Sequence, residues 1–270
     1  MPIRLEADPT FADRLRAADR TLYGMWSCGG SALAAEICAG SGLDIVLIDG
    51  EHSPVGLESI LAQLQAVAAY PAVPLVRAPY GDPVVLKQLL DLGAQNVLVP
   101  MVDSVEQAEA MVRAVRYPPH GVRGVGSALA RSSRWSRIPD YLARADALVS
   151  LTVQIETTQA LAVADAIAAV DGVDALLVGP ADLAASMGLL GQQNHPDVIA
   201  AVERVIEAGR AVGTPVGVNA FDPATADRYA AAGAAYVLVG SDVTLLARAS
   251  EALADRFIGA SPDAPAAASY

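Results

Sequence analysis

Eight short apolar runs, separated by segments with helical spacing, constrain the fold of this chain more than any other feature. The runs occupy residues 21–26, 44–49, 73–79, 96–102, 151–156, 175–179, 214–221 and 236–242. Continuous apolar runs of this length are typical of strands that are buried on both faces, as in parallel sheets. Eight such strands alternating with helices predict an α/β fold of the (β/α)8, or TIM, barrel class.

The segments between the runs agree with this prediction. Residues 54–70 place apolar side chains on one helical stripe, and residues 104–117 repeat the pattern. We expect helices to end at Gly93, Gly209 and Gly233, because glycine is common just beyond a helix C-terminus. The alternative is an open doubly wound sheet. It needs a G-x-G-x-x-G turn after the first strand, and Gly29 and Gly30 do not have that spacing.

Length and composition bound the domains and the partners. A single barrel domain over residues 1–259 and a flexible tail over 260–270 account for the 270 residues. The net charge of −12 argues against binding to nucleic acid or to an anionic membrane surface. No apolar run approaches the roughly 20 residues of a membrane helix. Cys28 and Cys38 are too few for a disulfide framework, so we expect reduced thiols and a cytoplasmic protein.

Polar side chains follow the ends of several predicted strands. Barrel enzymes carry their chemistry at the C-terminal ends of their strands, so such residues meet at one rim although they are far apart in sequence. We therefore expect the active site at that rim. The candidates, in chain order, are Asp49, Glu51, His52, Arg77, Gln154, Glu156 and Asp182.

Glu156 and Asp182 follow consecutive predicted strands, so their carboxylates should be neighbours. Two close carboxylates repel each other unless a cation or a proton lies between them. Hard oxygen ligands without a nearby cysteine favour Mg²⁺ or Mn²⁺. The pair therefore predicts a divalent metal site. The alternative is that each carboxylate caps the helix that follows it.

His52 and Arg77 are candidates for catalytic groups. Asp49 precedes His52 by three residues, and an Asp–imidazole pair would make His52 a general base. The alternative is a histidine in a surface loop. Arg77 should lie close to the barrel axis, where its charge needs either a substrate anion or a carboxylate at the rim.

Two turns are candidates for anion binding. The turn at 179–182 places Gly179, Pro180 and Ala181 at the start of a helix, where backbone N–H groups attract a carboxylate or a phosphate. Residues 239–242, after the last strand, occupy the phosphate-binding position of many barrels. The long connection over 118–140 indicates a functional loop or a subunit contact.

Five segments together carry a resemblance to a known family. They are "DIVLIDGEHSP" (44–54), "RAPYGDPVVLKQLLDLGAQNVLVPMVDSVEQA" (77–108), "RYPPHGVRGVG" (116–126), "VQIET" (153–157) and "VGPADLAASMG" (178–188). In this order they resemble the HpcH/HpaI family of class II, metal-dependent pyruvate aldolases, over about residues 24–249. The chain departs from the family pattern at Gly50 and in the segment that holds Cys28 and Gly29.

The resemblance implies a barrel of the phosphoenolpyruvate/pyruvate type and a role for each matching residue. Glu156 and Asp182 are the implied ligands of Mg²⁺, Mn²⁺ or Co²⁺. His52, supported by Asp49, is the implied base, and Arg77 is the group that faces the enolate oxygen. Implied substrate contacts are Gln154, the backbone around Gly179, Pro180 and Ala181, and, from a neighbouring subunit, Asp82.

The implied activity is reversible cleavage of a 4-hydroxy-2-oxo acid to pyruvate and an aldehyde through a metal-bound pyruvate enolate. The type example is 4-hydroxy-2-oxoheptanedioate (2,4-dihydroxyhept-2-ene-1,7-dioate) aldolase, an enzyme of aromatic catabolism. The expected partners are a small 2-oxo acid, an aldehyde and further copies of the chain in a hexamer, a trimer of dimers. A Schiff-base mechanism is not expected, because the only lysine, Lys87, lies within a predicted helix.

Three alternatives stay open. One is a citrate-lyase-like carbon–carbon lyase acting on a CoA ester, for which the arginines between 113 and 144 offer a basic groove. Another is a decarboxylating cyclase of the macrophomate synthase type. The last is a non-catalytic binding barrel, against which the intact set of His52, Glu156 and Asp182 argues.

Overall fold

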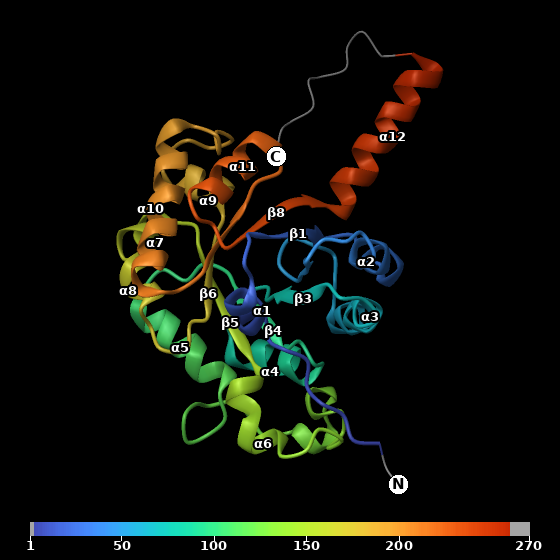
Figure 1. Cartoon of the computed structure of the whole chain (residues 1–270), viewed down its shortest axis with the longest axis vertical. Coiled ribbons are helices and arrows are strands. Elements are labelled where there is room, and N and C mark those ends of the chain that lie inside the picture. Colours follow the sequence, from blue (N-terminus) through green and yellow to red (C-terminus); the bar gives the residue numbers. More distant parts are fainter. Residues whose placement is uncertain (1–2, 260–270) are drawn as a thin grey trace.

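The computed structural model describes residues 3–259, in which eight parallel strands close into a barrel in chain order (Figure 1). Each strand pairs with the next, and β8 pairs with β1. The strands are β1 (Leu22–Ser27), β2 (Ile45–Asp49), β3 (Val73–Arg77), β4 (Asn96–Val99), β5 (Ser150–Ile155), β6 (Ala175–Val178), β7 (Val216–Asn219) and β8 (Tyr236–Ser241). Every predicted run overlaps one strand, so the barrel prediction is confirmed.

Helices follow the strands and surround the barrel. They are α1 (Phe11–Ala17), α2 (Ala32–Ala39), α3 (Leu57–Val67), α4 (Pro83–Asp91), α5 (Val105–Val115), α6 (Tyr141–Arg144), α7 (Thr158–Ala162), α8 (Ala164–Ala168), α9 (Pro180–Ser186), α10 (Pro196–Val212), α11 (Pro223–Ala231) and α12 (Asp242–Ile258). The long connection after α5 contains short 3₁₀ turns at Ser127–Leu129, Arg131–Ser133 and Ala145–Leu148. The predicted stripe on 54–70 is the inner face of α3, where Ile60, Leu64 and Val67 are buried.

The apolar side chains of the strands form two separate cores. One fills the barrel interior and includes Leu47, Leu75 and Leu98. Phe11 of α1 joins this core, with its ring edge-on to Tyr236 at 5.0 Å between centroids. The other core lies between the strands and the helices. Because strand side chains are buried on both faces, the polar residues are displaced to the strand ends, where the site lies.

The prediction that helices end at glycine is confirmed at Gly93 and Gly233 and is wrong at Gly209. Gly93 and Gly233 follow α4 and α11 with φ of +88° and +102°, the left-handed region that favours glycine. Gly209 instead lies inside α10, which ends at Gly213 with φ +81°. A Cβ at Gly209 would lie 2.3 Å from Val216 Cγ2, so this glycine permits close packing of α10 on β7.

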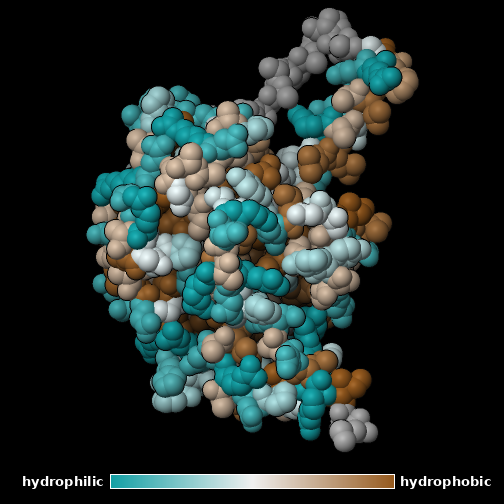
Figure 2. All heavy atoms as spheres, in the orientation of Figure 1, coloured by the Kyte–Doolittle hydropathy of each residue, from teal (hydrophilic) through white to brown (hydrophobic). Residues whose placement is uncertain are grey.

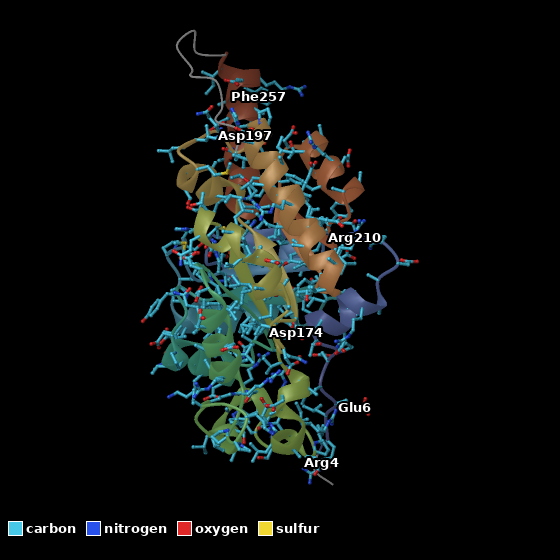
Figure 3. The ribbon with its side chains drawn as sticks, turned by 90° about the vertical axis from the view of Figure 1, so that its left-hand side faces the viewer. Arg4, Glu6, Asp174, Asp197, Arg210 and Phe257 are labelled. Carbon is cyan, nitrogen blue, oxygen red and sulfur yellow. The ribbon has the colours of Figure 1, made fainter. Side chains whose placement is uncertain are left out.

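α12 projects from the barrel, and none of its residues is buried in a single chain (Figure 1). Apolar side chains lie open along it, as Figure 2 shows; they include Leu246, Leu253 and Phe257. In Figure 3, Phe257 marks one end of the molecule and Arg4 the other. No helix within residues 3–259 is long and apolar enough to cross a membrane. The single domain over 1–259 stays a prediction, and the predicted tail at 260–270 lies outside the described residues.

Candidate active site

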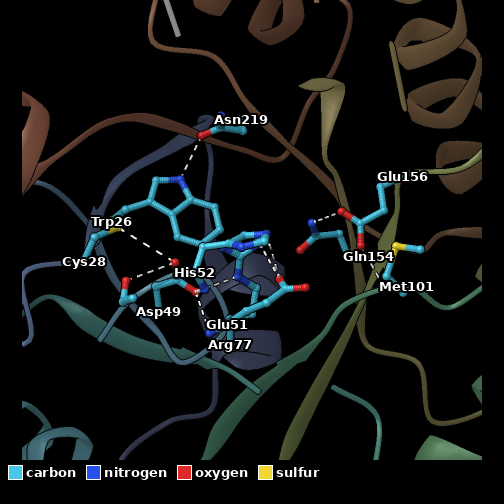
Figure 4. A network of polar contacts seen from close by, with 11 residues as sticks. Trp26, Cys28, Asp49, Glu51, His52, Arg77, Met101, Gln154, Glu156 and Asn219 are labelled. Atoms are coloured by element: carbon cyan, nitrogen blue, oxygen red, sulfur yellow. Dashed lines mark hydrogen bonds and ion pairs between the residues drawn. The ribbon is translucent and has the colours of Figure 1, made fainter. Parts of the chain in front are cut away.

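The candidate site lies at the C-terminal rim of the barrel, where the fold brings together residues from several strands. Asp49 and Arg77 are the last residues of the neighbouring strands β2 and β3. Glu156 directly follows β5, and Asp182 lies in the first turn of α9, after β6. Figure 4 shows Asp49 and Arg77 on one side of this site and Glu156 on the other.

Arg77 and Asp49 form a buried ion pair. Arg77 Nε donates to Asp49 Oδ1 over 2.9 Å, and the side chains are 8% and 2% exposed. Burial alone would raise the pKa of Asp49, but Arg77 and the amides of Glu51 and His52 more than offset this, so the pKa lies below its ordinary value. Asp49 is therefore a carboxylate, and it holds the guanidinium in place.

Two further contacts fix the guanidinium of Arg77. Glu51 Oε2 lies 2.9 Å from Arg77 Nη1, as an ion pair without hydrogen-bond alignment. The ring of Trp26, at the end of β1, lies 4.3 Å from Arg77 Cζ, and the indole N–H donates to Asn219 Oδ1 over 2.8 Å (Figure 4). Burial raises the pKa of Glu51, and Asp49 and Asp182 add to the shift against the opposing effect of Arg77. The negative charge that we expected near Arg77 is thus provided by Asp49 and Glu51 at the rim.

Glu156 is a buried carboxylate with no cationic partner in the described part of the chain. Its Oε1 accepts the N–H of Met101 over 2.7 Å, and its Oε2 accepts the amide of Gln154. Burial raises the pKa of Glu156 to about 7, and the charges of Asp182 and Glu51 add to the shift. Met101 adopts a left-handed backbone with φ +54°, a costly conformation of the kind that clusters at functional sites.

Neither Glu156 nor Asp182 caps a helix, so the alternative interpretation of this pair is wrong. The N-cap of α7 is Thr157, and that of α9 is Gly179. Among residues 3–259, no group donates a hydrogen bond to the Asp182 side chain. A Cβ at Gly179 would lie 2.9 Å from Glu156 Oε2 and 3.0 Å from Gln154 Nε2, so a larger residue here would displace these side-chain ends.

Glu156 and Asp182 fit a divalent cation. They offer hard oxygen ligands, and the charge of Asp182 adds to the raised pKa of Glu156. No ion pair within the described residues neutralises either carboxylate. Gln154 Oε1 is also buried without a hydrogen-bond partner. No three His, Cys, Asp or Glu side chains within residues 3–259 could enclose a metal by themselves. Two carboxylates with further positions open to water and substrate agree with that finding and with a catalytic rather than a structural metal.

His52 lies at the rim with its ring 68% exposed. The expected contact between its imidazole and Asp49 is not formed, because Asp49 Oδ1 accepts the backbone N–H of His52 instead, over 3.4 Å. The carboxylate nearest the ring is Glu51, with Oε2 3.9 Å from Nε2. Asp49 therefore orders the loop after β2 and holds Arg77, and the carboxylate beside the His52 ring is Glu51.

The expected anion cradle at 179–182 is smaller than the sequence indicated. The N–H of Gly179 already donates to Ile155 O over 3.2 Å, and Pro180 has no N–H. Only Ala181 and Asp182 present free N–H groups in the first turn of α9. Asp82 caps α4 by accepting from the amides at 84 and 85, so its expected contact with a neighbouring subunit stays a prediction.

The position after β8 does not offer the expected phosphate site. The carboxylate of Asp242 occupies it and accepts the N–H groups of Cys28 and Gly29 over 2.8 and 3.0 Å. Sequence reasoning also missed Trp26 and Met101 as parts of the site, and it placed Glu51 at the rim without a role. Trp26 ends a predicted strand, which was the available signal, but nothing in the sequence marks the strained backbone of Met101.

A carboxylate-lined rim with a buried arginine, on a closed parallel barrel, defines the chain as a barrel enzyme with its site at the strand C-termini. The family model HpcH/HpaI aldolase/citrate lyase matches residues 22–249, and the chain belongs to this family. It is therefore a carbon–carbon lyase, as the sequence predicted.

Curated relatives and a solved structure agree with this assignment. A hydroxypyruvate/pyruvate aldolase of Pseudomonas aeruginosa is 51% identical over 96% of each chain. A 4-hydroxy-2-oxo-heptane-1,7-dioate aldolase of Salmonella dublin is 51% identical over 92% of this chain and 94% of its own. A crystal structure of a protein of the same family from Burkholderia cenocepacia superposes with a TM-score of 0.87 at 41% identity, covering 91% of this chain and 97% of the other.

Proposed function

We propose that the chain is a class II aldolase that uses a divalent metal to cleave a 4-hydroxy-2-oxo acid reversibly to pyruvate and an aldehyde. The observation that carries the proposal is the pair of Glu156 and Asp182, two carboxylates without a cationic partner within residues 3–259, facing the ordered guanidinium of Arg77. The names of the curated relatives support pyruvate or hydroxypyruvate as the 2-oxo acid and 4-hydroxy-2-oxoheptanedioate as a substrate.

Glu156 and Asp182 would hold Mg²⁺, Mn²⁺ or Co²⁺. The bound cation supplies a Lewis acid that stabilises negative charge on the 2-oxo oxygen. Arg77 adds a second positive group whose orientation is fixed before substrate arrives, because Trp26 and Asp49 hold it. Gln154 directs its free Oε1 to the same region, and the N–H groups of Ala181 and Asp182 are the remaining donors for the substrate carboxylate.

His52 is the proposed base. In the cleavage direction it takes the proton of the 4-hydroxyl, the C3–C4 bond breaks, and the bonding electrons pass to C3 as the enolate of pyruvate forms. Protonation of C3 then completes pyruvate, and the aldehyde leaves with its new carbonyl. Glu51, near the ring of His52, stabilises the imidazolium that this step creates.

The aldolase is proposed to act in the cytoplasm as a hexamer, a trimer of dimers, in aromatic catabolism. The projecting α12 supports self-association, because its apolar side chains Leu246, Leu253 and Phe257 are exposed in one chain. Exposed apolar side chains on the long connection, including Leu129 and Trp135, support a second contact. Asp82 would complete a neighbouring site from within such an assembly.

A citrate-lyase-like reaction on a CoA ester is the second candidate, since the description of the family covers both activities. The arginines that suggested a basic groove do not support it. Arg123 is 1% exposed, and Arg131 Nη1 donates to Leu92 O beside Gly93, at the N-terminal end of β4 and away from the rim.

The direct test is release of pyruvate from 4-hydroxy-2-oxoheptanedioate and from shorter 4-hydroxy-2-oxo acids. Protein treated with EDTA should release none, and Mg²⁺, Mn²⁺ or Co²⁺ should restore release. Metal-independent release would contradict the proposal. Metal-dependent cleavage of a CoA ester, without any cleavage of the 2-oxo acids, would favour the second candidate.

A further inference from the structure

Asp242 links the last helix of the barrel to the loop that follows β1. It is the first residue of α12, directly after β8. Its Oδ1 accepts the N–H of Cys28 over 2.8 Å, and its Oδ2 accepts the N–H of Gly29 over 3.0 Å. Each carboxylate oxygen therefore accepts one N–H of a loop more than 200 residues earlier in the chain, and Oδ1 also accepts the N–H of Val243.

This loop borders the site. Cys28 Sγ lies 3.9 Å from Asp49 Oδ2, on the side of Asp49 opposite to its contact with Arg77 (Figure 4). The other end of the loop is tied to α3, because Ser59 Oγ donates to Gly30 O over 2.7 Å. Without Asp242, no other side chain within residues 3–259 holds the amides of Cys28 and Gly29.

Helix capping accounts for only part of what Asp242 does. The N-cap of α12 is Ser241, whose Oγ accepts the N–H of Thr244 over 3.2 Å. Asp242 Oδ1 also accepts the N–H of Val243 over 2.8 Å, but its Oδ2 accepts only the N–H of Gly29 in the loop. The close approach to the loop is also specific, because a Cβ at Gly29 would lie 3.1 Å from Asp242 Oδ2. The Cys28–Gly29 segment, which departs from the family pattern, is thus the one that contacts this carboxylate.

We propose that Asp242 is a positioning residue that holds the loop at 28–30 as one wall of the substrate mouth, and so sets the affinity for the substrate. This inference rests on the proposed aldolase function. Asp242 touches none of the groups proposed to react, so its removal should weaken binding of the substrate more than it slows the chemical step.

The test uses Asp242→Asn in the full chain. The substitution keeps the shape of the side chain but places an NH₂ group against a backbone N–H. We expect KM for the 4-hydroxy-2-oxo acid to rise about tenfold while kcat changes less than about threefold. Gly29→Ala, which crowds the same contact from the loop, should give a weaker effect of the same kind. Asp222→Asn is the matched control, because Asp222 caps α11 without touching the loop.

A second measurement does not depend on activity. The rate at which iodoacetamide alkylates Cys28 reports the order of the loop, and the buried Cys38 is an internal reference. Burial raises the pKa of the Cys28 thiol to about 11, so the wild type should react slowly. The charge of Asp242 raises the pKa of both thiols, so Asp242→Asn should speed alkylation of both. Release of the loop should raise the rate for Cys28 about tenfold or more beyond the change at Cys38.

The two readouts separate the inference from the proposed function. Faster labelling of Cys28 with no aldolase activity in any protein, wild type included, would support the role of Asp242 in holding the loop. It would contradict the proposed aldolase reaction. A rate for Cys28 that rises no more than that for Cys38, or equal losses in kcat and kcat/KM, would overturn the role of Asp242 even if the wild type is an active aldolase.

Discussion

Arg77 Nε lies 2.9 Å from Asp49 Oδ1, and the two side chains are buried at the ends of neighbouring strands. Asp49 also accepts the backbone N–H groups of Glu51 and His52. One carboxylate therefore fixes both the proposed enolate-stabilising group and the loop that carries the proposed base.

Replacing Arg77 should show this dependence. Arg77→Ala leaves Asp49 and Glu51 without their cation, and breaking such a buried pair costs about 3–5 kcal/mol of the free energy of unfolding. Arg77→Lys keeps the charge but loses the planar contact with Trp26, so kcat should fall about 100-fold with a smaller loss of stability. Urea denaturation and steady-state kinetics measure the two effects. Wild-type kcat in Arg77→Lys would show that the guanidinium geometry is unimportant.

Glu156→Ala and Asp182→Ala should each lower metal-dependent turnover by about a thousandfold or more, equivalent to roughly 4 kcal/mol. Both variants should keep the far-ultraviolet circular dichroism of the barrel, because neither side chain caps a helix. Calorimetric titration with Mn²⁺ should show the loss of binding directly. Asp165→Ala, on the exposed side of α8, is the control and should bind Mn²⁺ normally. Full affinity in either site variant would remove that residue from the metal site.

The pH dependence of stability should carry the signature of Glu156. Burial raises its pKa from an ordinary 4.5 to about 7. The folded, metal-free protein therefore binds this proton more tightly than the unfolded chain does. The resulting stabilisation is complete below about pH 4.5 and is lost as the pH rises through 7, a decrease of about 2–3 kcal/mol.

Urea denaturation in EDTA at about pH 5 and about pH 8 measures this decrease. Glu156→Gln has no proton to lose, so it should reduce the pH dependence by that amount and be the more stable protein at about pH 8. Identical pH profiles for the wild type and Glu156→Gln would show that the carboxyl titrates normally.

His52→Ala should lower kcat for cleavage by about 10²–10⁴-fold, as expected for loss of a general base, while pyruvate still binds. Glu51→Gln should also lower kcat, because it removes the carboxylate nearest the charge that the imidazole gains when it takes the proton. Wild-type kcat in Glu51→Gln would mean that this carboxylate does not act on His52.

Gly50→Ala should be destabilising, although glycine here departs from the family pattern. A Cβ at this position would lie 2.5 Å from Arg77 O, and backbone must move to admit it. We expect a loss of about 1–3 kcal/mol in the free energy of unfolding, with a fall in kcat as the Arg77 carbonyl shifts. Gly56→Ala, where no backbone atom lies within 4 Å of the added Cβ, is the control.

The sequence predicted the barrel because strands buried on both faces appear as continuous apolar runs, and eight such runs recur along the chain. It also predicted which polar residues reach the rim, since each one lies near or just beyond the C-terminal end of such a run. It could not predict which groups pair there. The Asp49 side chain turns to Arg77 rather than to His52. Two carboxylates, Asp49 and Glu51, share one arginine, and Glu51 also lies near the histidine.

The wrong prediction at Gly209 shows a second limit of the sequence, which does not reveal contacts between distant segments. Glycine in a helix and glycine at a helix end look alike in sequence, and only the approach of Val216 to α10 distinguishes them. Asp242 and Cys28 meet because β8 closes on β1. That contact depends on closure of the barrel, which no local segment encodes.

The most direct measurement for the central claim is exchange of the methyl protons of pyruvate in D₂O, followed by NMR, because it reports formation of the enolate without any aldehyde. The account predicts exchange by the wild type with Mg²⁺ or Mn²⁺, none after EDTA, and none by Glu156→Ala or Asp182→Ala. Exchange that continues in EDTA, or in either variant with metal, would contradict a metal-dependent enolate held by these two carboxylates.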